Sequence, residues 1–532
     1  MSIMLIRPPF EPTGFDQQFQ EPLNLGYLAA VLRREGFDVR LVDAEFCGLD
    51  TPAILNEVAT EQPALVGVSL MSARNAGAAL DLVEGIREWA APAAHITAGG
   101  HFATFHADYL LRMAPGLDCI VLFEGEAVIA DLARRVLSGT PWPETPGLAL
   151  RDGRGPSARI CRTDRAKPIA DLDTLPYPAR DLLPRAIQQG LSPVVLSSRG
   201  CCGACSFCTI HTFMQQAGGR PWRGRSPRNV VDEIQNLVDH FHIGEVGFLD
   251  DDFIGTKTEG RRRAAAIADL LLERRLDIIY NIECRPDMVE RELFARLKES
   301  GLRSVFIGIE GVTPAAIQAF HKGINRDLAD RALQILRDLD LDADVGFILY
   351  YPDATLEEVW EGYEFLKRHG QCDVHTALNR LFVVPGAPIL EQLRQEGRLR
   401  EVGADAALGV YEYDYADRRV GVLLAILRVA VLPLFTTWYN ALKAFRRLRA
   451  DRKFRADAEA AGARLDQIRA FTASIDRVVE RCFEEAYGRT SGQAEPDGDL
   501  LQWARRLQGD ARTAMQAAAR ATSCTEFLAA TG

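Results

Sequence analysis

The chain has 532 residues, of which 47% are hydrophobic and 25% charged, and its formal net charge is −11. This composition is ordinary for a folded globular protein, and the length predicts several domains. The acidic balance gives no case for nucleic-acid binding, which needs basic surfaces. The N-terminus lacks a secretory signal, and the most apolar run, residues 420–435, is shorter than the ~20 residues needed to cross a bilayer. We therefore expect a cytoplasmic protein with no membrane span.

The first 150 residues alternate β-rich runs with amphipathic helical patterns, which predicts a parallel sheet covered on both faces by helices. Five strands are predicted, at Ile3–Ile6, Asp38–Val42, Leu65–Ser69, His95–Thr97 and Cys119–Leu122. Such a flavodoxin-like or Rossmann-like α/β domain binds ligands beyond the carboxyl ends of its strands. The candidate binding residues at that edge are Ser69, Ser72, Gly99, Gly100, His101, Gly125 and Glu126.

Residues 151–190 carry turn signals without sustained periodicity and are predicted to form a hairpin and a linker. From residue 191 to 398 six strand candidates alternate with helices, which predicts a partial (β/α)6 barrel with active residues at the carboxyl ends of its strands. The candidates are Val194–Ser197, Glu245–Leu249, Ile278–Ile282, Ser304–Ile309, Ala343–Leu349 and Val374–Val383. Residues 399–532 are predicted to form an α-helical domain that covers the barrel mouth or contacts the substrate.

Cys201, Cys205 and Cys208 follow the first predicted barrel strand with the spacing C-x3-C-x-F-C. Three thiolates can hold a [4Fe-4S] cluster and leave its fourth iron without a protein ligand. That open iron can bind the amino and carboxylate groups of S-adenosylmethionine, so that one electron cleaves the carbon–sulfur bond and gives a 5′-deoxyadenosyl radical. A zinc site, which ordinarily has four ligands, and buried free thiols are the alternatives. Cys202 is interpreted as a thiol that is not a ligand.

The cysteine motif resembles the signature of the radical S-adenosylmethionine (radical SAM) superfamily. By this resemblance Asp250 and Asp251, after the second strand, bind the methionine amino end of the cofactor. The third and fourth strands end in groups that would face its ribose and carboxylate: Glu283, Arg285, Gly308 and Glu310. A solvated acidic loop and structural ion pairs are the alternatives for these residues. His211, past the cysteines, and His375, on the last predicted strand, are candidate acid–base groups.

The N-terminal domain is similar to the cobalamin-binding domains fused ahead of radical SAM barrels, so the resemblance covers roughly residues 1–400. Small and hydroxyl side chains at the sheet edge would let a nucleotide tail approach closely, although a Rossmann-like nucleotide domain shows the same features. The domain has no D-x-H-x-x-G, and the loop Phe10–Gln20 contains no histidine. The lower axial ligand of many cobalamin enzymes is therefore missing, as it is in many enzymes that this architecture resembles.

The resemblance implies a cobalamin-dependent radical SAM methyltransferase that acts on an unactivated carbon of a natural-product or peptide substrate. One S-adenosylmethionine would methylate Co(I) cobalamin, and another would be cleaved after an external flavodoxin- or ferredoxin-type reductant supplies an electron. A cyclase or ring-rearranging enzyme with the same cofactors is one alternative. A non-catalytic cobalamin-binding or iron–sulfur electron-transfer protein is an alternative of another class.

Overall fold

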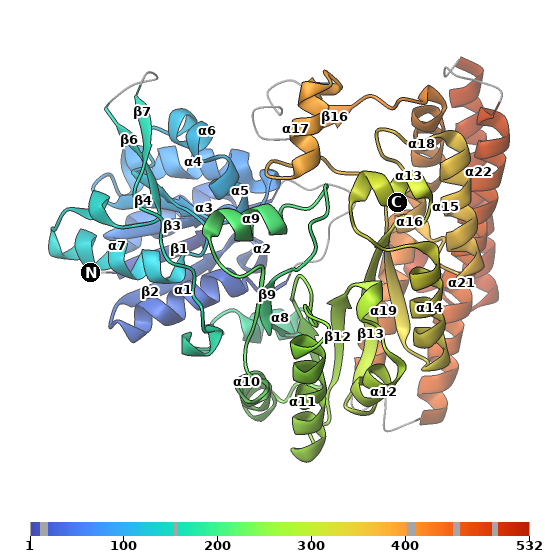
Figure 1. Ribbon diagram of the computed structural model, residues 1–532, viewed down its shortest axis with the longest axis horizontal. Helices are drawn as coiled ribbons and strands as arrows, with labels where there is room; N and C mark the ends of the chain where they lie inside the picture. The colour runs from blue at the N-terminus through green and yellow to red at the C-terminus, as the bar shows by residue number, and fades with distance from the viewer. Residues whose placement is uncertain are drawn as a thin grey trace.

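A computed structural model describes residues 2–10, 20–153, 158–401, 411–450, 458–491 and 498–530. Three parts lie side by side in it, with the barrel between the N-terminal domain and the C-terminal helices (Figure 1). The barrel therefore contacts both other parts, while these two lie at opposite ends of the molecule.

The N-terminal sheet has the strands β1 (Ser2–Arg7), β2 (Asp38–Asp43), β3 (Leu65–Ser69), β4 (His95–Gly99), β5 (Cys119–Val121), β6 (Leu148–Asp152) and β7 (Arg159–Arg162). They lie in the order β2-β1-β3-β4-β5-β6-β7, and the first five are parallel. This parallel order is that of a flavodoxin-like sheet, so the predicted fold is confirmed. The antiparallel strands β6 and β7 extend the sheet to Arg162, at the start of the segment where we expected a hairpin and a linker.

Helices cover both faces of this sheet, because each presents one apolar stripe to the strands. The helices α1 (Leu23–Arg34) and α7 (Glu126–Ser138) pack on one face. The other face is covered by α3 (Thr51–Glu61), α4 (Ala76–Gly85) and α6 (Ala107–Met113). The shorter helices α2 (Ala44–Cys47) and α5 (His101–Phe105) follow strand ends, so α5 begins at the predicted binding edge.

The barrel contains five parallel strands: β8 (Val194–Val195), β11 (Glu245–Phe248), β12 (Ile279–Cys284), β13 (Leu302–Glu310) and β14 (Asp342–Phe347). Their order is β14-β13-β12-β11-β8. Two further strands, β9 (Ser198–Gly200) and β10 (Trp222–Gly224), form a separate antiparallel ribbon around α9 (Ile210–Ala217). The other helices are α8 (Leu183–Gln188), α10 (Pro227–Phe241), α11 (Glu259–Glu273), α12 (Arg291–Glu299), α13 (Pro314–Phe320), α14 (Arg326–Asp338) and α15 (Leu356–Arg368).

The sixth predicted strand, Val374–Val383, is wrong over its first half, which forms the helix α16 (Val374–Leu378). A capping box explains the difference: the Asp373 carboxylate accepts the amide of Thr376 at 2.8 Å, and the Thr376 hydroxyl accepts the amide of Asp373 at 3.0 Å. This local satisfaction of backbone donors outweighs the β-branched composition. Beyond the helix, a single parallel bridge between Tyr350 and Arg380 occupies the sixth-strand position.

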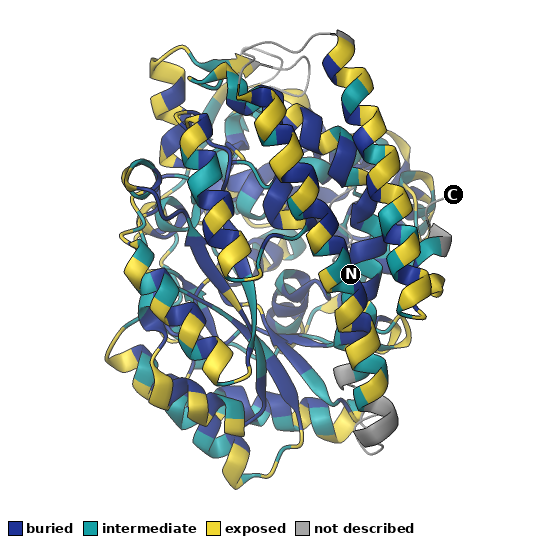
Figure 2. Ribbon diagram, turned by 90° about the vertical axis from the view of Figure 1, so that its right-hand side faces the viewer, coloured by how far each residue is buried: buried dark blue, intermediate teal, exposed yellow. Residues whose placement is uncertain are grey.

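After the barrel come α17 (Pro388–Gln395), the antiparallel pair β15 (Leu399–Glu401) and β16 (Tyr411–Tyr413), and the helices α18 (Arg418–Val431), α19 (Phe435–Ala450), α21 (Ala458–Thr490) and α22 (Gly498–Ala521). The helices turn their buried residues toward the barrel and their exposed residues outward (Figure 2). They pack against α15 and α16, where Tyr363 stacks on Phe483 with ring centroids 4.2 Å apart. They therefore cover the side of the barrel beside β14.

One apolar helical run, Arg418–Leu448, is long and apolar enough to cross a membrane by length and composition. However, 61% of its 18-residue apolar window is buried inside the protein. Its contacts with α16, α21 and α22 account for that burial.

Candidate active site between two sheet edges

The three predicted cluster ligands lie in the loop between β9 and α9. A Cβ placed on Gly203 would lie 3.5 Å from Cys201 Sγ and 3.6 Å from Cys205 Sγ, so these two thiols border one space. The amide of Cys208 donates to the carbonyl of Cys205 at 3.2 Å, which keeps the third cysteine within one turn of the second. Cys202 is exposed. The donor set and its compact loop fit an iron–sulfur cluster with three protein ligands.

No three His, Cys, Asp or Glu side chains in the described part of the chain have the spacing of a site for a single metal ion. This does not conflict with a cluster, because each cysteine thiolate of a cluster binds a different iron. A single zinc ion would instead draw all its sulfur ligands to about 2.3 Å.

Ser206 fixes the cysteine loop to the barrel. Its amide donates to the carbonyl of Phe320 at 3.0 Å, and its hydroxyl donates to the carbonyl of Ala319 at 2.6 Å. The carbonyl of Ser206 accepts the amide of Ile389, the second residue of α17, at 2.8 Å. Two separate elements thus hold the loop between Cys205 and Cys208.

Two cations border the thiols. Arg285 Nη1 would lie 2.9 Å from a Cβ on Gly203, and its Nη2 donates to the carbonyl of Lys322 at 2.9 Å. Lys322 Nζ pairs with Glu310 Oε1 at 2.9 Å, and a Cβ on Gly308 would meet that Nζ at 2.5 Å. Positive charge favours the thiolate form that binds iron. The structure thus brings Arg285, Gly308 and Glu310 together beside the cysteines.

The predicted carboxylates divide into two groups. Asp250 is 2% exposed and accepts the hydroxyls of Ser197 and Ser198, and burial raises its pKa to about 6. Asp251 is exposed and accepts the amide of Gly200 at 3.0 Å. Burial, with the charges of Asp251 and Asp250, raises the pKa of the half-buried Glu283 to about 7. Asp250 therefore braces the barrel, whereas Asp251 and Glu283 are accessible to a ligand.

The edge of the N-terminal sheet contains buried polar groups without partners in the described residues, namely Ser72 Oγ and Asn75 Oδ1. Ser69 differs, because its hydroxyl accepts the Asn24 amide at 2.7 Å. Gly100 has φ +117°, and a Cβ there would lie 2.5 Å from the Leu70 carbonyl oxygen, so only glycine lets these two loops touch. The free polar atoms and the close backbone fit a bulky polar ligand such as cobalamin. Residues 11–19, most of the predicted loop Phe10–Gln20, lie outside the described residues.

Two family models match the chain, "B12 binding domain" over residues 17–133 and "Radical SAM superfamily" over residues 195–366. The chain belongs to the cobalamin-dependent radical SAM enzymes. Its cofactors are a [4Fe-4S] cluster, S-adenosylmethionine and cobalamin. The two matched regions coincide with the N-terminal sheet and the barrel, so the predicted family and architecture are confirmed.

Among similar proteins, an uncharacterised methyltransferase of Pyrococcus horikoshii is 28% identical over 69% of this chain and 78% of that protein. The hopanoid C-3 methylase of Methylococcus capsulatus is 30% identical over 62% of this chain and 61% of that protein. An anaerobic magnesium-protoporphyrin IX monomethyl ester cyclase of Rubrivivax gelatinosus is 26% identical, over 69% and 66%. The relatives of this radical SAM enzyme thus include both methyltransferases and cyclases.

Solved structures share the fold. The cobalamin-dependent radical enzyme OxsB, with aqua-cobalamin and S-adenosylmethionine bound, gives a TM-score of 0.75 at 18% identity, over 98% of this chain and 80% of that one. The methyltransferase TsrM of Kitasatospora setae, with cobalamin and a [4Fe-4S] cluster bound, gives 0.64 at 19% identity, over 92% and 100%. At such identities the likeness concerns the fold alone.

In this radical SAM enzyme the two sheet edges meet at His101. Its ring stacks on Phe213 of α9 with centroids 4.8 Å apart, and its Nε2 lies 3.3 Å from the hydroxyl of Thr209. Burial lowers the pKa of His101 to about 4, so the imidazole is neutral near pH 7. A second contact between the two domains involves Gly386, just before α17, because a Cβ there would lie 2.5 Å from the Phe105 ring of α5. The helix that follows Cys208 therefore touches the edge that carries the predicted cobalamin residues.

Ion pairs join the same two edges, and sequence reasoning missed most of them. Glu126, a predicted cofactor residue, pairs with Arg199, two residues before Cys201. Glu124 pairs with Arg223 at 2.6 Å and with Arg199 at 3.3 Å. All these side chains are at most 12% exposed. Gly125 lies between the two acids, and a Cβ there would contact Leu28 at 3.4 Å. The only sequence signal is the pairing of an acidic loop with an arginine-rich segment.

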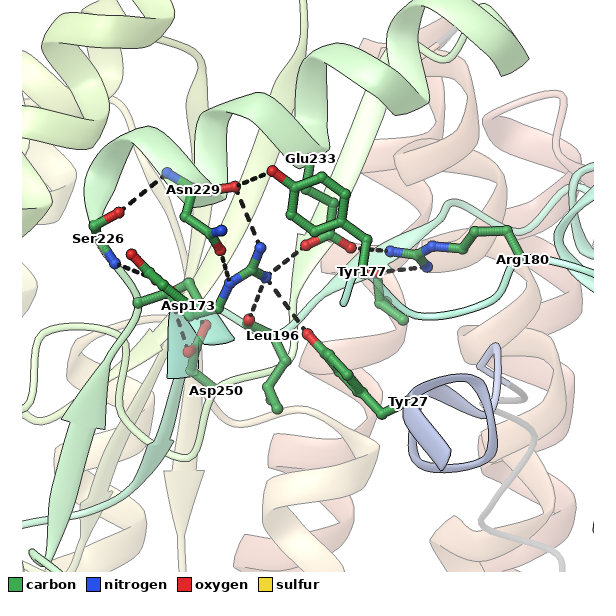
Figure 3. A network of polar contacts seen from close by, with 12 residues as sticks. Tyr27, Asp173, Tyr177, Arg180, Leu196, Ser226, Asn229, Glu233 and Asp250 are labelled. Carbon is green, nitrogen blue, oxygen red and sulfur yellow. Dashed lines mark hydrogen bonds and ion pairs between the residues drawn. The ribbon is translucent and has the colours of Figure 1, made fainter. Parts of the chain in front are cut away.

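A second buried network links the domains around Arg225 and Glu233 (Figure 3). Glu233 also pairs with Arg180 at 2.6 Å, and Arg180 pairs with Glu21 of the N-terminal domain at 2.5 Å. The Tyr27 hydroxyl of α1 lies 3.5 Å from Arg225 Nη1. These arginines therefore serve the domain interface.

The two candidate histidines lie in different places. His211 is the second residue of α9 and lies three positions after Cys208, so it is close to the cysteine loop. Its Nδ1 is buried with no partner in the described residues. His375 is exposed on α16, two residues after Asp373, and the acidic residues Asp344 of β14 and Asp476 of α21 lie near Asp373. The structure does not bring His375 to the cysteines.

Proposed function

We propose that this enzyme methylates an unactivated carbon of a small-molecule or peptide natural product. The observation that carries the proposal is the contact between the two edges: α9, which follows Cys208, lies against His101 of the cobalamin-binding domain. A substrate held between these edges would face both cofactors at once. Such positioning is the main contribution that a protein makes to cofactor chemistry.

Each group of residues has a separate task in this proposal. Cys201, Cys205 and Cys208 would hold the cluster, which would supply the electron for cleavage of S-adenosylmethionine. Arg285, whose Nε and Nη2 already donate to Asp287 and to the carbonyl of Lys322, would offer its Nη1 to the carboxylate of that cofactor. Asp251 and Glu283 would offer carboxylates for its ammonium group and ribose. Ser72 and Gly100 accommodate the nucleotide tail of cobalamin. His211 is the nearest candidate for moving a proton at the substrate.

A cyclase that uses the same cofactors is the second candidate, because the relatives at 26% identity include magnesium-protoporphyrin monomethyl ester cyclases. We place either activity in the cytoplasm, where a reducing environment would preserve the cluster and the thiols of the eight other cysteines. Reduction of the cluster there would depend on a small electron-carrier protein.

The test uses anaerobically purified, reconstituted enzyme with hydroxocobalamin, a reductant, metabolite extract, and S-adenosylmethionine carrying a CD3 methyl group. Methylation predicts a product that retains the CD3 label, together with 5′-deoxyadenosine and S-adenosylhomocysteine. Cyclisation predicts an unlabelled product that has lost hydrogens. Cys205→Ala is the control and should form neither product. Failure of the wild type to cleave S-adenosylmethionine in any extract would overturn the proposal.

A further inference from the structure

Three exposed cations, Arg165, Lys167 and Arg220, form a basic surface beside the C-terminal end of α9. The Arg165 guanidinium lies 2.9 Å from a Cβ placed on Gly218, at the end of α9, and Pro168 lies 3.2 Å from one placed on Gly219. The segment 165–168 therefore runs along the chain that leads to Arg220. We propose that this basic surface docks the acidic one-electron carrier protein that reduces the cluster, an inference that rests on the proposed radical function.

The basic surface stands out against the charge of the whole chain. The protein carries a net charge of −11, yet residues 159–168 contain four cations and one acid, Asp164. Within the described ranges, no carboxylate forms an ion pair with Arg165, Lys167 or Arg220. The neighbouring arginines behave differently, since Arg199 and Arg223 are buried and paired with glutamates. Exposed like charges repel one another, so a negatively charged partner would stabilise them.

The basic surface lies close to the cluster ligands along two routes. In the β9–β10 ribbon Trp222 pairs with Gly200, and a Cβ on Gly200 would lie 2.1 Å from the carbonyl oxygen of Pro221. The chain beside Arg220 thus touches the residue before Cys201. Along the other route, α9 separates Cys208 from Gly218, and the helix itself is about 12 Å long at 1.5 Å per residue. A carrier seated here would lie near the cluster, and electron transfer falls steeply with distance.

The transfer of a single electron to the cluster defines the class of partner protein. A reduced flavin or iron–sulfur protein with an acidic surface gives up one electron and is oxidised by one electron, and the cluster gains that electron. No proton or group is transferred. Attraction between opposite charges would speed the encounter and weaken as salt screens it.

The experiment compares the loaded wild-type enzyme with a variant that carries Arg165→Glu, Lys167→Glu and Arg220→Glu. A matched control carries Arg262→Glu, Arg331→Glu and Arg368→Glu, three exposed arginines on the outer helices of the barrel. Calorimetry measures binding of an acidic flavodoxin and, separately, of an acidic [2Fe-2S] ferredoxin at low and moderate salt. Stopped-flow spectroscopy then measures cluster reduction by each reduced carrier and by dithionite.

We expect the basic-surface variant to bind at least one of the two carriers tenfold more weakly or worse. Its binding should depend less on salt, and that carrier should reduce its cluster more slowly. Its dithionite-driven reduction should equal that of wild type, and the control variant should bind normally. Normal carrier binding by the basic-surface variant, or an equal loss in the control, would overturn the docking proposal. Because binding is measured without substrate, that result would leave the proposed function standing, whereas absence of S-adenosylmethionine cleavage with dithionite would overturn the function itself.

Discussion

Glu124 of the cobalamin-binding domain accepts a hydrogen bond from Arg223 of the barrel at 2.6 Å, and the two side chains are only 8% and 4% exposed. Arg199, the second cation on Glu124, lies two residues before the first cysteine of the cluster loop. The pair thus connects the last loop of the N-terminal sheet to the ribbon that carries the cysteines. Because both side chains are buried, we expect substitution of either one to destabilise the protein.

We predict that Glu124→Gln lowers the free energy of unfolding by about 3 kcal/mol, because it leaves the buried Arg223 without a counter-charge, whereas Arg199 keeps Glu126. Guanidinium unfolding followed by tryptophan fluorescence measures it, since Trp222 lies beside Arg223. Glu57→Gln is the control: it removes an exposed pair with Arg40 and should cost less than about 1 kcal/mol. Burial would raise the pKa of Glu124, but Arg223 and Arg199 hold it below 4.5. Its contribution should be complete above pH 4.5 and lost as the pH falls through the folded value.

The buried imidazole of His101 predicts an acid-sensitive interface. Between its ordinary pKa of 6.5 and its folded value of about 4, the unfolded chain binds a proton that the folded protein does not. Stability should therefore fall as the pH drops through this window and be unaffected by His101 above it. His101→Phe keeps a ring against Phe213 and should make the melting temperature less dependent on pH between pH 6.5 and 4. An unchanged pH profile in this variant would contradict the prediction.

The cysteines differ in exposure, which predicts a difference in iron content. Cys205→Ala should prevent formation of a stable four-iron cluster, because it removes one of three ligands. Cys202→Ala should retain the iron and the optical absorption of the wild type, because the Cys202 side chain is exposed. Iron analysis and spectra after reconstitution decide the point. An equal loss of iron in both variants would indicate that Cys202 is a ligand.

Gly386 and Gly397 form a matched pair for testing the contact with Phe105. Both have positive φ, +89° and +67°, but nothing lies within 4 Å of a Cβ on Gly397. Gly397→Ala should cost about 1–2 kcal/mol from the left-handed conformation alone. Gly386→Ala should cost more, because the Phe105 ring must also shift, which disturbs its packing against His101 and Phe213. Adding Phe105→Leu should remove that excess in a double-mutant cycle, and two equal costs would refute the contact.

Many features were predictable because their signals are local in the sequence. The five parallel strands of the N-terminal sheet follow from runs of three to five residues. The start of α10 depends on two adjacent residues, since Ser226 precedes Pro227 and its hydroxyl accepts the amide of Asn229 at 3.2 Å. The cysteine spacing likewise places three thiols in one loop. The same local reasoning failed at Val374–Leu378, where the β-branched composition indicated a strand and the Asp373 cap favoured a helix.

The sequence by itself thus determined the two α/β units and the family, and it predicts the three cluster ligands. Only the tertiary structure decided which polar residues are accessible to cofactors. Glu126 and Arg199 are separated by 73 positions, and Asp250 meets Ser197 across 53, so no local pattern records that these candidates are paired inside the protein. A buried charge must find its partner wherever packing supplies one, whereas a helix cap or a ligand loop is complete within a few residues.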